Sequence, residues 1–437
     1  MGTEYKFTYA FPIYWDTPTQ WPHLKVELAW STRPTETPDW EDITAYCYSI
    51  NTRRGRQHEL ERVEAGTADI ELDNTDRRFD PTYTAGPYYG YLKPMRRIRV
   101  RAIWNGWIYG LFSGYVEEWP PDWRDGVDPF IKVKAVDAFK VLALPKLNAS
   151  YTAKLSGARV QDILDAIGFT GGYNWLLDSA TNAQLGTTTT LAPSGDRWVM
   201  AGQTTIQAST LADTSALQHL QDVEKAEYGV LFMDGDGVVR FYERHYRYRI
   251  PMVTPIATFS DTLTGIHYSK LEMTYGDSEI YNDVRMKYTG GTIQTASNAA
   301  SQLDYFKRTL AEEDLLASSN SEMKDRADWE LSRRKDPMWR TRAIEFDCKD
   351  PAIWPYALQL EINDRITVDR TPTVGNVISE SYWIGGVNWD IARGQNWKLR
   401  YALERVDPTI YWIMVGGYHI AVWPYYSTLG TNTVLAY

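Results

Sequence analysis

The side chains that most often do chemistry are sparse in this 437-residue chain, which has six histidines and two cysteines. None of the histidines falls in an HExxH motif, and no GxSxG or P-loop pattern occurs. Cys47 and Cys348 lie about 300 positions apart without a CxxC pair, which favours two buried free thiols over zinc or a disulfide framework. The sequence therefore predicts no catalytic residues, no metal site and no cofactor.

Two acidic motifs resemble parts of known chemical sites, a glycosidase cleft and a calcium loop. Glu117 and Glu118 stand beside Trp119, as in a glycosidase cleft, but neighbouring strand residues point to opposite faces and cannot flank one bond. Residues 234–237, Asp-Gly-Asp-Gly, match half of a calcium loop, but the twelfth position is His245 where the full pattern has glutamate. A hairpin turn is the preferred interpretation there, and a carbohydrate-binding or glycosidase function stays open as an alternative.

Arginines form three short clusters in the first hundred residues. The formal net charge of −10 and the pI near 5.3 argue against specific nucleic-acid binding, which needs a basic face. We therefore expect these side chains to form inter-subunit or structural ion pairs. The candidate interface arginines are Arg53, Arg54, Arg56, Arg77, Arg78, Arg96 and Arg97.

Aromatic residues are unusually frequent, with 18 Trp and 30 Tyr, and they suit sheets and protein interfaces. The last segment, residues 409–437, combines aromatic and apolar residues with almost no charge, so we expect it to bind a neighbouring protein. The candidate residues there are Tyr411, Trp412, Trp423, Tyr425, Tyr426 and Tyr437. No run of 18 apolar residues predicts a membrane span, and no secretion signal is expected at the N-terminus.

The elements that must position these residues are mainly strands. Polar and apolar residues alternate along 25–30, 67–72, 97–104 and 130–136, and Asn105-Gly106 predicts a type I′ hairpin turn. Helical spacing appears over 156–169, with Ser156 as the N-cap, and over 214–229, with Thr214 as the N-cap. Residues 304–336 read as a charge-rich helical connection.

A weak internal repeat organises this pattern. Residues 95–136 contain a charged strand, a hairpin, a strand with Gly114, Val116 and Trp119, and a second charged strand. Residues 363–406 repeat the scheme with Gly386, Val387 and Trp389. We therefore predict a mainly β (α+β) protein with two β-barrel domains that flank a small α+β insertion. The predicted boundaries are 1–145 (first β-barrel), 146–260 (insertion), 261–408 (second β-barrel with a helical connection) and 409–437 (C-terminal segment).

Residues 53–97 also carry specific motifs: RRGR at 53–56, ExGTA at 64–68, LDNxDRRFDP at 72–81, GPY at 86–88 and LxPMRR at 92–97. Together with LFSGYVEEW at 111–119 and the ending LGTNTVLAY, they resemble minor tail proteins, or tail-tip hub proteins, of long-tailed non-contractile (siphovirus-type) phages. The dense resemblance covers about residues 20–145 and is weaker elsewhere.

The resemblance implies a non-enzymatic structural protein with two tail-tube-like β-barrels per chain. Three copies would form a pseudo-sixfold hub ring that joins the tail tube to the tip and gates the exit of the tape-measure protein and DNA. The implied partners are further copies of the chain, a distal tail protein or the tail tube, the tape-measure protein, and a tip fibre or receptor-binding protein. The implied location is the virion tail tip, after synthesis in the host cytoplasm. A distal tail protein forming a hexameric ring, and a tail-associated glycosidase, are the alternatives.

Overall fold

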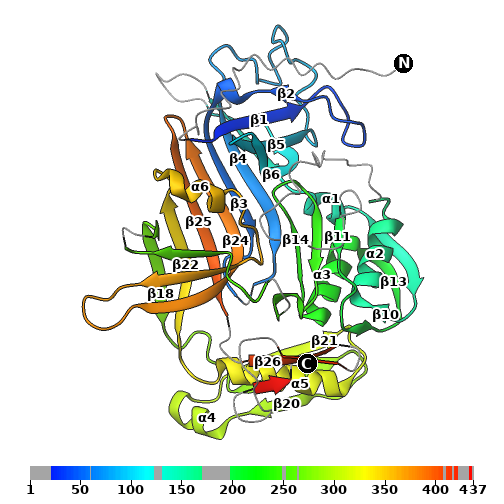
Figure 1. Cartoon of the computed structure of the whole chain (residues 1–437). Helices are drawn as coiled ribbons and strands as arrows, with labels where there is room; N and C mark the ends of the chain where they lie inside the picture. The colour runs from blue at the N-terminus through cyan, green and yellow to red at the C-terminus, as the bar shows by residue number, and fades with distance from the viewer. Residues whose placement is uncertain are drawn as a thin grey trace.

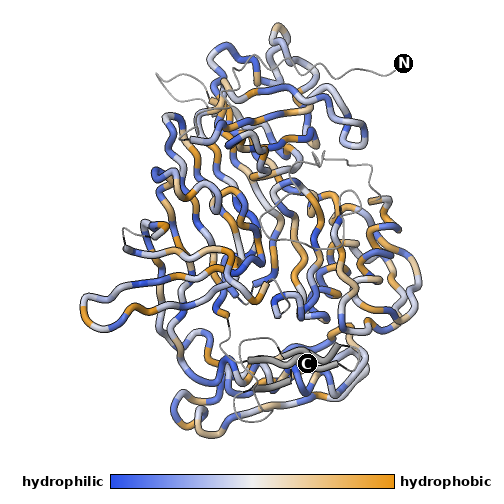
Figure 2. The backbone as a smooth tube through the Cα atoms, viewed as in Figure 1, coloured by the Kyte–Doolittle hydropathy of each residue, from blue (hydrophilic) through white to orange (hydrophobic). Residues whose placement is uncertain are grey.

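The computed structural model describes residues 21–59, 61–122, 130–169, 197–248, 252–262 and 265–406, together with the backbone of three C-terminal strands. The chain is mainly β, as predicted, and Figure 1 shows a large sheet on one side with smaller α+β parts beside and below it. Apolar and polar residues alternate along many of the sheet strands in Figure 2, which is the pattern that buries one face of each strand.

The first part of the large sheet, called here the first strand set, contains strands from residues 23 to 136. Its order is β3-β4-β8-β6-β5-β1, and all of its neighbouring strands are antiparallel. The two-residue strands β2 (Glu41–Asp42) and β7 (Pro121–Asp122) extend it. The bounds are β1 (His23–Ala29), β3 (Cys47–Gly55), β4 (Glu64–Asp73), β5 (Arg97–Trp104), β6 (Trp107–Glu118) and β8 (Phe130–Val136).

The remaining strands of the sheet, the second strand set, lie between residues 257 and 405. Their order, β18-β22-β25-β24-β23-β16, repeats that of the first set element by element along the chain. One pairing differs, because β16 and β23 are parallel whereas β1 and β5 are antiparallel. The bounds are β16 (Ala257–Ser260), β17 (Ile266–His267), β18 (Lys270–Tyr275), β22 (Trp339–Asp347), β23 (Arg365–Arg370), β24 (Ile378–Ala392) and β25 (Asn396–Arg405).

Backbone hydrogen bonds fix how the two sets correspond. Met95 N–H donates to Val116 O over 2.7 Å, and Asn363 N–H donates to Ile384 O over 2.7 Å, with a positive φ at both donors. A β-bulge follows Val116 in β6 and follows Ile384 in β24. Val116 therefore corresponds to Ile384. The sequence pattern predicted the repeat correctly. It aligned Val116 with Val387, however, which lies three positions from the true counterpart.

The two sets are joined edge to edge through β3 and the second half of β24. Gly386 lies opposite Gly55, and the pairing continues to Ala392 opposite Ser49. Gly55 has φ +80°, and a Cβ there would stand 2.3 Å from Gly385 O, so the close approach of the two strands requires glycine. The alternation of polar and apolar residues in the sequence did not predict this pairing of β3 with β24.

The α+β part between the strand sets packs against the sheet in one common core. The predicted turns and helices are largely confirmed: Asn105 and Gly106 both have positive φ, and Gly168 follows the end of α2 with φ +69°. The N-cap predictions were wrong, because Ser156 and Thr214 make no cap and the Ser156 hydroxyl donates instead to Glu227, 2.7 Å away. The elements are α1 (Phe139–Ala143), β9 (Lys146–Tyr151), β10 (Lys154–Leu155), α2 (Ser156–Ala166), β11 (Arg197–Val199), β12 (Thr205–Ile206), β13 (Ser209–Ser215), α3 (Ala216–Glu227), β14 (Val230–Met233), β15 (Val239–Tyr242) and the short 3-10 turn η2 (Tyr246–Tyr248).

The charge-rich connection is only partly helical. With the strands that precede it, the connection forms a second, smaller core built from Val284, Met286, Met323 and Ala327. Its elements are β19 (Asp283–Tyr288), β20 (Gln294–Ser297), α4 (Ala299–Tyr305), β21 (Thr309–Leu315) and α5 (Asn320–Arg334). The expected helix over 304–336 is thus interrupted by a strand that pairs with β19. The short α6 (Trp354–Ala357) precedes β23.

Beyond residue 406 the described backbone forms β26 (Ile410–Val415), β27 (Tyr418–Ala421) and β28 (Thr433–Leu435). The domain boundaries predicted at residues 145, 260 and 408 remain predictions. None of the helices in the described part of the chain is long and apolar enough to cross a membrane.

Candidate functional site

The first arginine cluster lies at the end of β3, where the two strand sets meet. Arg54 is buried and ion-paired with Glu361 at 2.9 Å, and its Nε donates to Leu111 O over 3.0 Å. Arg56 is ion-paired with the buried Glu404. Arg53 is half exposed, with a carboxylate only at 4.0 Å. Two of the three predicted interface arginines thus hold parts of one chain together.

The other predicted arginines also make contacts within the chain. Arg77 pairs with Asp80 at 2.7 Å, and Arg78 pairs with Asp76 at 2.5 Å. Arg96 and Arg97 donate to backbone carbonyls in the loop after β1, at Thr32 and Pro34. All of these contacts lie within one chain. A role between subunits stays a prediction, and Trp423, Tyr425, Tyr426 and Tyr437, like the side chains of Tyr411 and Trp412, lie outside the described residues.

The carboxylates of both acidic motifs contact other groups of the same chain. Glu117 is paired with Lys140, and Glu118 with Lys134 at 3.4 Å, so the two carboxylates face different lysines. Residues 234–237 form the predicted hairpin turn, in which Asp234 accepts from Asp236 N–H and Val238 N–H. No group of three or more His, Cys, Asp or Glu side chains suited to a metal ion occurs among the residues that the structure describes.

The tip of the β14–β15 hairpin is inserted between the two strand sets. A Cβ on Gly110 of β6 would stand 2.2 Å from Asp236 Oδ1, and Gly235 N–H donates to Glu361 Oε2 over 3.2 Å. Burial, the nearby Asp234 and Glu361 raise the pKa of Asp236 to about 7, against the opposing effect of Arg240 and Arg101. Gly235 at this tip and Arg54 therefore both donate to Glu361.

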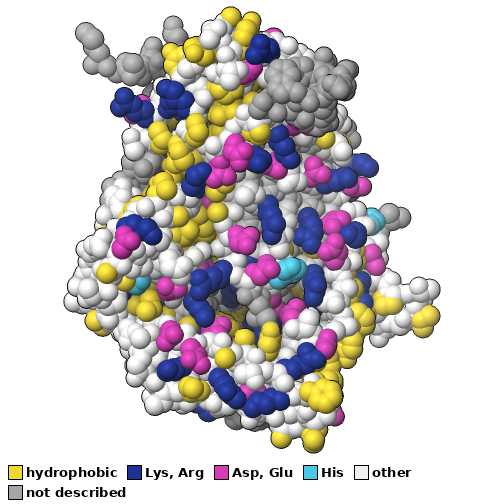
Figure 3. Space-filling view, turned by 180° about the vertical axis from the view of Figure 1, so that it is seen from behind, with side chains coloured by type: hydrophobic (Ala, Val, Ile, Leu, Met, Phe, Trp, Pro, Cys, Tyr) yellow, Lys and Arg dark blue, Asp and Glu magenta, His cyan; other side chains and the backbone are white. Residues whose placement is uncertain are grey.

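A charged cavity of about 320 Å³ is the candidate functional site. It lies between the β3–β4 loop, α3, the end of β15 and η2, α5, and the second strand set. Its described lining contains nine Arg or Lys side chains and six Glu side chains, a formal excess of three positive charges in a protein whose net charge is −10. Figure 3 shows acidic and basic side chains intermingled over the lower half of one face of the molecule.

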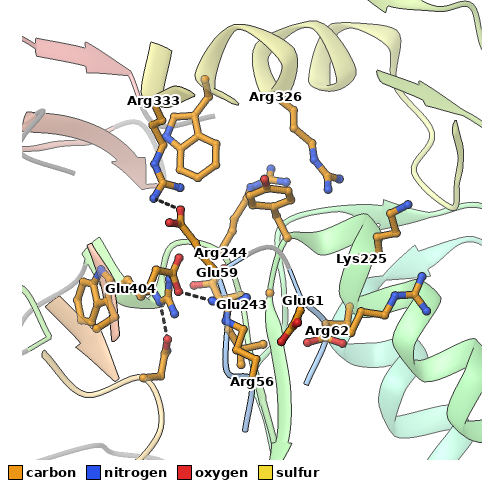
Figure 4. Close-up of a pocket in the computed structure, with 18 of the residues that line it drawn as sticks. Arg56, Glu59, Glu61, Arg62, Lys225, Glu243, Arg244, Arg326, Arg333 and Glu404 are labelled. Atoms are coloured by element: carbon orange, nitrogen blue, oxygen red, sulfur yellow. Dashed lines mark hydrogen bonds and ion pairs between the residues drawn. The ribbon is translucent and has the colours of Figure 1, made fainter. Parts of the chain in front are cut away.

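Two buried glutamates anchor the wall of this cavity. Glu59 contacts Arg333 at 3.1 Å, Arg334 at 2.8 Å and Arg340 at 2.8 Å. Burial alone would raise the pKa of Glu59, but these arginines hold it below its ordinary value. Glu404, paired with Arg56 and with Arg247 at 2.9 Å, also has a lowered pKa because its arginines outweigh its burial. Figure 4 shows the dashed contacts that join these groups.

Arg326 of α5 is a buried lining residue. Its side chain is 2% exposed, and its guanidinium lies 4.0 Å from the centre of the Tyr228 ring and 2.9 Å from Glu312. Its Nε and Nη1 have no hydrogen-bond partner within the described part of the chain. Figure 4 shows Arg326 reaching from α5 into the space that Lys225 and Arg62 approach from α3 and the β3–β4 loop.

Sequence reasoning identified only Arg56 among the residues of this cavity. Three other cationic lining residues, Arg326, Arg333 and Arg334, appeared there only as part of the charge-rich connection. A signal was present, because Met323 and Ala327 set the buried face of α5 and Arg326 and Glu330 lie on that same face. Charged residues at buried helical positions indicate a polar contact inside the protein.

No protein-family model and no curated protein matches the sequence. Solved structures do match: the 43 kDa tail protein of prophage MuSo2 from Shewanella oneidensis has a TM-score of 0.56 at 12% identity, over 88% of this chain and 98% of that chain. A tail protein from Neisseria meningitidis MC58 has a TM-score of 0.53 at 10% identity, over 88% of this chain and 96% of that chain. The predicted likeness to phage tail proteins is thus confirmed at the level of the fold.

Proposed function

We propose that this chain is a structural component of a phage-type tail, and that three copies form a hub ring at the tail tip. The observation that carries the proposal is the repetition of one six-strand order within a single chain. Three chains would supply six such strand sets, which is the number that a ring needs to match a sixfold tube. The fold shared with two tail proteins supports the same assignment.

The internal joint suggests how neighbouring chains would meet. Within the chain, the first set uses the edge of β3 to pair with β24 of the second set. The equivalent edge of the second set is β18, which among the described strands pairs with β22 alone. In a ring, β18 would approach the β6–β7 segment of the next chain, the counterpart of β24. Pro120 and Pro121 in that segment cannot donate hydrogen bonds, so the joint between chains would be weaker than the joint within one.

In this role the ring would join the tail tube to the tip and gate the exit of the tape-measure protein and DNA. The acidic net charge suits a wall that DNA must slide past without binding. Its partners would be a distal tail protein or the tube, the tape-measure protein, and a tip fibre or receptor-binding protein, and its place would be the virion.

Hydrogen–deuterium exchange at two protein concentrations tests the proposed joint. Oligomer formation should slow exchange in peptides that cover residues 270–275 and 115–122, while peptides from β23, already paired on both sides, should not change. Concentration-dependent assembly without any change in these two peptides would rule out this joint. Protection of the β1–β2 edge instead would favour the rival arrangement, a hexameric ring of distal tail proteins.

A further inference from the structure

The cavity beneath α5 contains buried positive charge that the chain itself does not fully pair. An arginine cannot release its proton at ordinary pH, so the Arg326 guanidinium stays charged although its side chain is 2% exposed. One carboxylate, Glu312, contacts it, and two of its nitrogens have no acceptor among the residues that the structure describes. A buried cation in this condition is costly unless a further acceptor completes its contacts.

Other cations face the same space from different elements. Lys225 lies on α3, Arg62 lies on the β3–β4 loop, and Arg244 follows β15. The Arg62 guanidinium is 3.8 Å from the exposed Asp222, a contact too long to be a hydrogen bond. Burial raises the pKa of Glu224, which also lines the cavity, to about 7, so near neutral pH this carboxyl is only partly ionised.

We propose that this cavity binds a small oxyanion of the phosphate or carboxylate class, with Arg326, Lys225 and Arg62 as its principal ligands. An oxyanion supplies the acceptors that two Arg326 nitrogens lack among the described residues, and its charge makes each of those hydrogen bonds stronger than a hydrogen bond to water. The volume of about 320 Å³ equals that of roughly ten water molecules, which is enough for such an anion and part of its hydration shell.

A bound anion would connect three parts of the chain that are far apart in sequence. Its ligands come from the β3–β4 loop of the first strand set, from α3 of the α+β part, and from α5 of the connection. Binding would therefore stabilise the arrangement in which Arg326 and Trp329 of α5 contact Tyr228, directly after α3. This inference stands whether or not the chain forms a tail hub, because it uses only contacts within one chain.

The test is calorimetric titration of the full-length protein with inorganic phosphate at pH 7, with sodium chloride adjusted to hold ionic strength constant. We expect saturable one-to-one binding that is at least about tenfold weaker in Lys225→Gln and in Arg62→Gln, since each loses a charge-assisted contact. Lys324→Gln, on α5 but paired with Asp328 outside the cavity, is the matched control and should bind like the parent. A parallel titration with citrate tests the carboxylate source.

Arg326→Gln should abolish binding, and its melting curve shows whether the variant still folds. If it does not fold, the Lys225 and Arg62 variants, which alter more exposed or less constrained positions, decide the question. Saturable binding of equal strength in the parent and in all cavity variants would mean an adventitious ion only. No saturable binding of either phosphate or citrate to the parent would likewise overturn the proposal.

Discussion

Arg54 and Glu361 form an ion pair of 2.9 Å across 307 positions of sequence, and this pair ties the first strand set to the second. The same guanidinium donates to Leu111 O in β6 and to Met233 O at the end of β14. Three parts of the protein therefore share one buried arginine. Its contacts explain how an arginine-rich stretch in an acidic protein can stabilise the fold instead of binding a nucleic acid.

Replacing Arg54 should lower the free energy of unfolding much more than replacing the neighbouring Arg53. Arg54→Met removes the cation paired with Glu361 and the side-chain donor to two carbonyls, so we expect a loss of about 3 kcal/mol in the free energy of unfolding. Arg53→Met, half exposed and with a carboxylate only at 4.0 Å, should change it by less than about 0.5 kcal/mol. Urea unfolding of both variants measures the difference, and equal losses would show that the buried pair is not a tie between the strand sets.

Gly55 should tolerate no side chain. Gly55→Ala places a methyl group 2.3 Å from Gly385 O at φ +80°, so strain and overlap both oppose it. Gly394→Ala is the control, because its φ is +83° and nothing lies within 4 Å of the added Cβ. We expect about 1 kcal/mol of destabilisation for Gly394→Ala and at least twice that for Gly55→Ala. Thermal unfolding distinguishes the two, and similar melting temperatures would contradict the close β3–β24 joint.

Glu224 should make stability depend on pH near neutrality. Burial raises its folded-state pKa from 4.5 to about 7, against the smaller opposing effects of its hydrogen bond from Leu231 N–H and of Arg56 and Arg62. The folded state thus binds this proton more tightly than the unfolded state, so the carboxyl destabilises the protein above pH 7, and the cost disappears as pH falls toward 4.5.

Glu224→Gln keeps an acceptor for Leu231 N–H and removes this cost. The variant should therefore be more stable than the parent by about 2 to 3 kcal/mol at pH 8, with the difference vanishing near pH 4.5. Glu61→Gln, a half-exposed glutamate that lines the same cavity, is the control and should leave the pH profile unchanged. A parallel displacement of the whole Glu224→Gln curve would point to a packing effect instead of titration.

The C-terminal segment should bind a neighbour without supporting the rest of the fold. Deletion of residues 409–437 removes a stretch rich in Tyr and Trp with almost no charge. The truncated chain should keep its melting temperature but fail to enter assembled tails when it replaces the full chain. Normal incorporation of the truncated chain would refute this role.

Local patterns predicted much of this fold. Alternation located four strands of the first set, and Asn105-Gly106 located its turn, because both signals depend on neighbouring residues alone. The register of the repeat was mistaken, because glycine and valine recur by composition whereas the true correspondence is set by the bulges after Val116 and Ile384. The β3–β24 joint and the cavity under α5 escaped prediction, since they depend on residues hundreds of positions apart.

The central claim concerns assembly, and the absolute mass of the purified protein tests it most directly. Light scattering, with electron microscopy of the same sample, should give a mass near 150 kDa, three times the chain mass of 50.2 kDa, and rings with a central hole. A ring of six chains, near 300 kDa, would contradict the trimeric hub and favour a distal tail protein.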